Sequence, residues 1–79
     1  MTLTVVSTNV AEPRHARVIE VFATGSRGGS HEWTVDFNRN GTIWGGYRHK
    51  PYLGYVEAHV IPLEITYAAK ACYEKEYCQ

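Results

Sequence analysis

The sequence predicts an α+β domain in which a three- to four-stranded antiparallel sheet, a meander, packs one face against a C-terminal helix. Three observations support this fold class. Residues 31–38 alternate apolar and polar side chains, as half-buried strands do. An Asn-Gly pair follows within residues 38–41, where it indicates a hairpin. Over residues 62–77 the apolar positions recur instead with helical spacing.

Size and composition limit the classes of function. The 79 residues make a single domain, residues 1–79, and 44% hydrophobic with 20% charged residues is typical of a globular chain. Eight Lys and Arg balance eight Asp and Glu. That balance weighs against a dedicated nucleic-acid binder, which usually carries a basic surplus. So short a chain buries only about 60% of its unfolded surface, which makes a homodimer an ordinary way to gain buried area.

The N-terminal half reads as two strands with a loop between them. The β-branched residues 2–7 predict the first strand, and Pro13 with its neighbours places a loop over residues 8–15. Residues 16–24 predict the second strand. The glycine- and serine-rich residues 25–30 predict the connection to the third.

Residues 31–38 and 42–48 predict the central hairpin. The apolar face is expected to carry Trp33, Val35, Phe37 and Ile43. Glu32, Thr34 and Asp36 take the other face of the first of these two strands.

Strict alternation along 42–48 places Tyr47 toward the core and leaves Trp44 with Arg48 on the open face, next to Glu32 and Asp36 if the register allows it. Gly45 and Gly46 indicate a bulge or a close approach by another backbone.

The C-terminal third contains one ambiguous segment and one clear helix. Residues 51–61 fit a strand or a helix, and we favour helix or irregular structure. Residues 62–77 predict a helix with Pro62 at its first position and Glu64 in its first turn. The stripe expected against the sheet comprises Ile61, Ile65, Ala68, Ala69 and Cys72. Leu63 and Tyr67 fall on the outer side, as candidate self-association residues.

Catalytic and metal-binding signatures are weak. The four histidines, at positions 15, 31, 49 and 59, are scattered, so we predict neither a metal site nor a cofactor. The glycine-rich loop at 25–30 fits no phosphate-binding motif. His49 with Arg48 and Tyr47 offers an acid and a phosphate clamp, but nothing in the spacing demands it, and we predict no enzyme activity.

The expected location is the cytoplasm. The N-terminus lacks the basic start and apolar run of a secretory signal, and no segment reaches the length of a membrane span. Cys72 and Cys78 are therefore expected to be reduced thiols, without a disulfide between them.

Residues 43–52, IWGGYRHKPY, interleave aromatic and basic side chains. We expect partner-binding residues at Trp44, Arg48, Lys50 and Tyr52, with Arg39 at the rim. These side chains suit a protein partner, because Trp, Tyr and Arg dominate binding hot spots. A small RNA- or DNA-binding module would use them to stack bases and meet phosphates. The third interpretation is that Trp44 caps a second small core, covered by the N-terminal strand or by residues 51–61.

In length, absence of a signal, aromatic surface and lack of catalytic motif, the whole chain resembles the small phage-encoded inhibitors of bacterial defence, the anti-CRISPR proteins. The resemblance implies a cytoplasmic inhibitor that binds a CRISPR effector complex and blocks access of target DNA or of a nuclease. The zero net charge departs from the strongly acidic members of this group. Occlusion of a site through shape and local charge is therefore the expected mechanism, and no residue role carries over by position.

Overall fold

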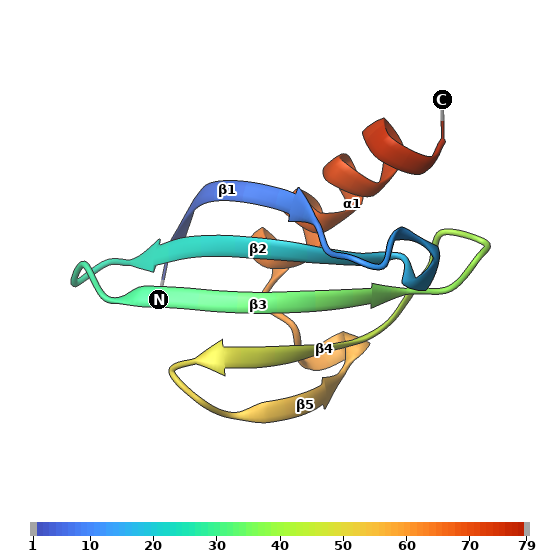
Figure 1. Ribbon diagram of the computed structural model, residues 1–79. Coiled ribbons are helices and arrows are strands. Elements are labelled where there is room, and N and C mark those ends of the chain that lie inside the picture. The colour runs from blue at the N-terminus through green and yellow to red at the C-terminus, as the bar shows by residue number, and fades with distance from the viewer. Residues whose placement is uncertain (1, 79) are drawn as a thin grey trace.

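A computed structural model describes residues 2–78 of the chain (Figure 1). Five strands form one antiparallel sheet in the order of the sequence: β1 (Leu3–Val10), β2 (Val18–Gly25), β3 (Ser30–Phe37), β4 (Ile43–Lys50) and β5 (Gly54–Glu57). A short 3-10 helix, η1 (Arg14–Ala16), lies between β1 and β2. A second one, η2 (Ala58–Val60), follows β5 and precedes the C-terminal helix α1 (Leu63–Tyr77). The predicted α+β meander with a C-terminal helix is confirmed in outline, with five strands in place of three or four.

The fifth strand lies in the ambiguous segment 51–61. The preferred helix or irregular structure is found at residues 51–53 and in η2 but is wrong for residues 54–57, which form β5. Gly54 adopts a left-handed φ of 89°, which turns the chain back, and the Leu53 amide closes the turn by donating to the Arg48 carbonyl at 3.1 Å. Tyr55 and Val56 then pair with β4. Pairing with a neighbouring strand decided this segment, because Gly54–Glu57 does not alternate apolar and polar residues.

β1 also runs three residues beyond the expected strand 2–7, into the predicted loop. A register shift between Val5 and Ser7 marks a β-bulge, and after it Thr8 pairs with Val21 and Val10 with Ile19. The bulge restores inward-facing positions that simple alternation would have placed outside. The loop before β2 is correspondingly shorter than predicted.

A single helix covers one face of the sheet. α1 packs on β1, β2 and β3, behind these strands in the view of Figure 1, while η2 and the residue after it cover β4. The core comprises Leu3, Ile19, Val21, Ala23, Trp33, Val35, Phe37, Ile61, Ile65, Ala69 and Tyr73. The predicted helical stripe is thus confirmed at Ile61, Ile65 and Ala69, whereas Ala68 and Cys72 are half-buried at its edge.

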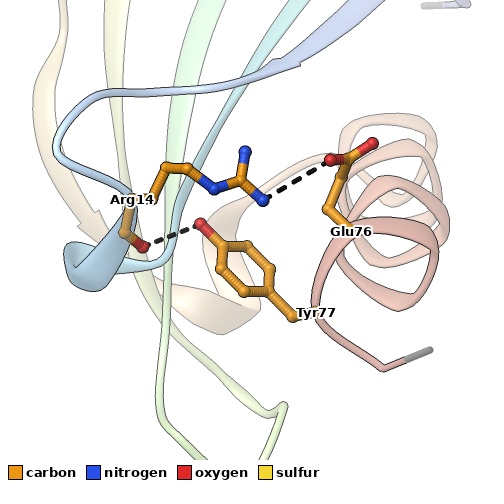
Figure 2. A network of polar contacts seen from close by, with 3 residues as sticks. All are labelled: Arg14, Glu76 and Tyr77. Carbon is orange, nitrogen blue, oxygen red and sulfur yellow. Dashed lines mark hydrogen bonds and ion pairs between the residues drawn. The ribbon is translucent and has the colours of Figure 1, made fainter.

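The C-terminal end of α1 is fixed to the turn before β2. The Tyr77 hydroxyl donates to the Arg14 carbonyl at 2.9 Å, and the Arg14 guanidinium lies 3.6 Å from the Glu76 carboxylate (Figure 2). Tyr73, which the stripe omitted, stacks on Phe37 with ring centroids 4.4 Å apart. These contacts hold the helix on the sheet at both of its ends, since Glu64 in its first turn accepts the Leu3 amide at 3.4 Å.

The two cysteines are free thiols, with Cys72 half-buried and Cys78 exposed. Within residues 2–78, no helix has the length and apolar character needed to cross a bilayer.

Candidate binding face on the open side of the sheet

The register of β4 decides which side chains reach the open face, defined here as the sheet face opposite α1. Phe37 pairs with Ile43 but Asp36 pairs with Gly45, so Trp44 is an extra residue at a bulge. Beyond the bulge the alternation is reversed. Tyr47 pairs with Thr34 and faces outward, and Arg48 pairs with Trp33 and faces the helix side.

The predicted orientation of Tyr47 toward the core was therefore wrong, and so was the joint placement of Trp44 and Arg48. Strict alternation fails here because the residue inserted at Trp44 moves Tyr47 and Arg48 to the other face. A second register shift, between Trp33 and Glu32, ends this effect before Lys50.

The two glycines of β4 each lie under a different side chain. A Cβ at Gly45 would lie 2.7 Å from Cζ of Tyr55, on the open face. A Cβ at Gly46 would lie 2.8 Å from Cδ1 of Ile61, on the helix side. The Gly-Gly pair thus lets side chains from the C-terminal half cover both faces of β4, which is the close approach that strand glycines indicate.

Four aromatic side chains extend across β4, β5 and the turn between them; we call Trp44, Tyr47, Tyr52 and Tyr55 the aromatic band. Trp44 packs against Tyr55 with ring centroids 5.6 Å apart, and the ring centroids of Tyr47 and Tyr52 are 6.1 Å apart. Tyr47 and Tyr55 are directly opposite in the register. Trp44, Tyr52 and Tyr55 are 64%, 75% and 47% exposed and Tyr47 is half-buried, so most of the band is open to solvent.

Carboxylates surround the aromatic band. Glu20 pairs with Thr34, and Glu32 pairs with Phe22 and Lys50. Gly45 lies in register between Asp36 on β3 and Glu57 on β5. The open face therefore gathers four carboxylates against one ammonium, although the whole chain has no net charge. Of these four acids, only Glu57 has a basic side chain within ion-pair distance among residues 2–78, the His59 imidazole, whose Nδ1 lies 3.4 Å from the carboxylate.

Burial and charge act together near the centre of this face. Partial burial raises the pKa of the Asp36 carboxyl above its ordinary 3.8. Burial, and then the negative charge of Asp36, raise the pKa of the Tyr55 phenol. The Asp36 carboxylate therefore disfavours ionisation of the neighbouring Tyr55 phenol.

A shallow hollow of about 200 Å³ lies beside the aromatic band, lined by Glu20, Phe22, Glu32, Trp33, Thr34 and His49. The His49 ring forms one wall of this hollow. Its Nε2 is 3.2 Å from the Thr34 hydroxyl, and its ring centroid is 4.6 Å from that of Tyr47. Two carboxylates and a phenyl ring thus share one concave position on the open face.

The predicted partner-binding residues are divided by the fold. Trp44 and Tyr52 belong to the aromatic band, and Lys50 lies at the end of β4, opposite Glu32. Arg39 lies in the turn before β4, at the other end of this strand, where its carbonyl accepts from Arg17 at 3.1 Å. These residues do not form one cluster.

Arg48 faces away from the aromatic band. Its Nε donates to the Pro51 carbonyl at 2.8 Å, and its guanidinium carbon lies 6.0 Å from the centre of the Trp33 ring. A hollow of about 330 Å³ on that side is lined by Leu3, His31, Trp33, Arg48, Pro51, Pro62 and Glu64. Arg48 thus closes the β4–β5 turn and covers the core tryptophan.

Tyr55, Glu20 and Phe22 were missed as open-face residues. The alternation of β2 could have assigned Glu20 and Phe22 to the face opposite Ile19 and Val21. Tyr55 carried no such signal, because its segment was not recognised as a strand.

Among the described residues, no group of three or more His, Cys, Asp and Glu side chains is arranged to hold a metal ion. Comparison of the chain with models of protein families, with curated proteins and with solved structures gives no match. The candidate site therefore rests on the geometry of the open face.

Proposed function

We propose that this chain is a non-catalytic binding protein that grips a partner protein with the open face of its sheet, and that it acts as an inhibitor of a larger assembly. The observation that carries this proposal is the exposed aromatic band on a sheet whose other face packs against α1, η2 and Ile61. Exposed aromatic side chains gathered on one face are typical of interaction sites, because they bury much area for little lost conformational freedom.

The size of the open face supports a protein partner. Four strands of eight residues and a shorter fifth span roughly 19 by 26 Å at ordinary strand spacings. That extent is of the same order as the roughly 800 Å² that each partner contributes to a standard interface. The charges on the face argue against the RNA- or DNA-binding alternative, because four carboxylates around the aromatic band would repel phosphates.

The resemblance to anti-CRISPR proteins supplies the first partner to test, a CRISPR effector complex. In this proposal the protein occludes a functional surface of that complex, so target DNA or a nuclease no longer reaches it. Enzyme activity is not needed for such inhibition.

The test expresses the full chain in bacteria that carry one defined CRISPR system at a time and measures plating of a targeted phage. Wild type should restore plating against at least one system and should capture that effector complex from nuclease-treated lysate. Trp44→Ala, Tyr55→Ala should lose both effects while remaining folded by circular dichroism. A matched control is Val6→Ala, Val60→Ala, which removes two exposed apolar side chains outside the aromatic band.

Three results would overturn parts of the proposal. Unchanged plating with every system excludes the anti-CRISPR role. Capture that nuclease abolishes shows that nucleic acid was the bound species. Equal loss of plating and capture in the control and in the aromatic variant shows that the aromatic band is not the specific binding site.

A further inference from the structure

The charges of the molecule are divided unevenly between the two faces of the sheet. The open face holds Glu20, Glu32, Asp36 and Glu57. Two arginines lie instead on the helix side, where Arg14 pairs with Glu76 and Arg17 donates to Tyr73. The zero net charge therefore hides a local field that favours a cationic partner at the open face.

Most carboxylates of the open face have no ion-pair partner among the described residues. Glu20, Glu32 and Asp36 have no ion-pair partner within residues 2–78. Lys50 is opposite Glu32 in the register, yet no ion pair joins them. Carboxylates that the fold leaves unpaired are available to a cation supplied from outside.

The hollow beside the aromatic band has the size and lining for one cationic side chain. Glu20 and Glu32 are diagonal neighbours on β2 and β3, with Phe22 in line with Glu20 along β2 and opposite Glu32. A guanidinium suits this position better than an ammonium, because its plane stacks on an aromatic ring while its N–H groups donate to two carboxylates.

We propose that the open face docks an arginine-bearing segment of the partner protein, with one guanidinium held between Glu20 and Glu32 over Phe22 and with the aromatic band packed against the rest of the segment. This inference rests on the proposed function, because it names the chemistry of the partner for the same face. Asp36 and Glu57 flank Tyr55 and supply the second acidic position, at the far end of the aromatic band. The partial burial that raises the pKa of Asp36 leaves that carboxylate short of solvation, which a bound cation would compensate.

The test uses backbone-amide NMR of the full chain and an acetylated, amidated peptide of alternating Arg and Gly. The matched probes are the same peptide with Glu in place of Arg and a short oligothymidine. The Arg peptide should shift amides of the open face around Phe22, Thr34 and His49, and Glu20→Gln, Glu32→Gln should weaken its binding about tenfold. Glu12→Gln, Glu74→Gln removes the same charge outside the open face and should bind as wild type does.

Four outcomes with these probes overturn the inference, and a fifth comes from the protein alone. The four are equal binding of the Glu peptide, shifts that lie on α1, equal weakening in the control variant, and oligothymidine shifting the same amides more strongly. A peptide-independent shift that grows with protein concentration also overturns it, because the occupant is then a second copy of this chain.

Partner capture by the two double variants distinguishes failure of the arginine-docking inference from failure of the proposed function. If Glu20→Gln, Glu32→Gln still captures the cellular partner while Trp44→Ala, Tyr55→Ala does not, the open face binds a protein that is not recognised through its arginine. If both variants capture the partner, the open face is not the binding site, and both proposals fall.

Discussion

The Tyr55 ring lies directly over Gly45 and occupies the space that a side chain at position 45 would need. The same ring packs against Trp44 on the open face. Gly45→Ala should therefore displace the Tyr55 ring. Because Tyr55 is 47% exposed and the contact is made by the end of its side chain, the ring can swing into solvent at little cost in stability. We expect partner capture to fall while the melting temperature changes by only a few degrees. Full capture by this variant would exclude Tyr55 from the interface.

Gly46→Ala, at the neighbouring residue, should instead destabilise the fold. The added methyl group would meet Ile61 Cδ1 at 2.8 Å and the Thr34 carbonyl oxygen at 3.2 Å, and neither can move away within the buried core. Overpacking of this kind costs about 1–3 kcal/mol. We expect a lower free energy of unfolding in urea titration, and a stability equal to that of Gly45→Ala would contradict the assignment of the two faces.

Arg17 and Tyr73 should be energetically coupled. The Arg17 guanidinium donates to the Tyr73 hydroxyl, and the Tyr73 ring is buried against Phe37. Tyr73→Phe keeps the stacked ring and removes only the hydroxyl, which should destabilise the fold by about 1–2 kcal/mol. Arg17→Ala should cost a similar amount, and the double variant should cost less than the sum of both. Strict additivity in a double-mutant cycle would mean that the hydrogen bond does not stabilise the protein.

Asp36→Asn should stabilise the protein at neutral pH. Burial raises the carboxyl pKa above 3.8, so the folded state holds the proton more tightly than the unfolded state does. The contribution of Asp36 to stability is therefore fully present below pH 3.8 and is lost as the pH rises through the raised folded pKa. Urea unfolding across this range should show the variant's advantage at pH 7 and its disappearance in acid. The pKa of Tyr55, followed by NMR of its ring, should fall in the same variant because the Asp36 charge is gone.

The outer face of α1 offers a test of self-association. Leu63 and Tyr67 are 63% and 65% exposed and lie one helical turn apart, on the side of the helix away from the sheet. If this pair joins two copies, sedimentation should show a dimer that Leu63→Ser, Tyr67→Ser converts to a monomer. A wild-type monomer at the highest soluble concentration would remove the homodimer from consideration.

The sequence by itself determined the α+β class, the central hairpin and the inner face of the helix. Alternation in residues 31–38 and the helical recurrence of Ile61, Ile65 and Ala69 are local patterns, and burial of these side chains followed the patterns. Asn38–Gly41 closed the hairpin as its composition predicts, with the Gly41 amide donating to the Asn38 carbonyl at 3.0 Å.

Only the tertiary structure decided the composition of the open face. The bulge at Trp44 is a property of how β4 pairs with β3, and it turned Tyr47 outward and Arg48 toward Trp33. The strand that carries Tyr55 forms because β4 offers it an edge, since its four residues hold too little periodicity to specify a strand alone. Strand register and edge pairing are interactions between distant residues, and they place the aromatic band and the carboxylates of this neutral chain on one uncovered face.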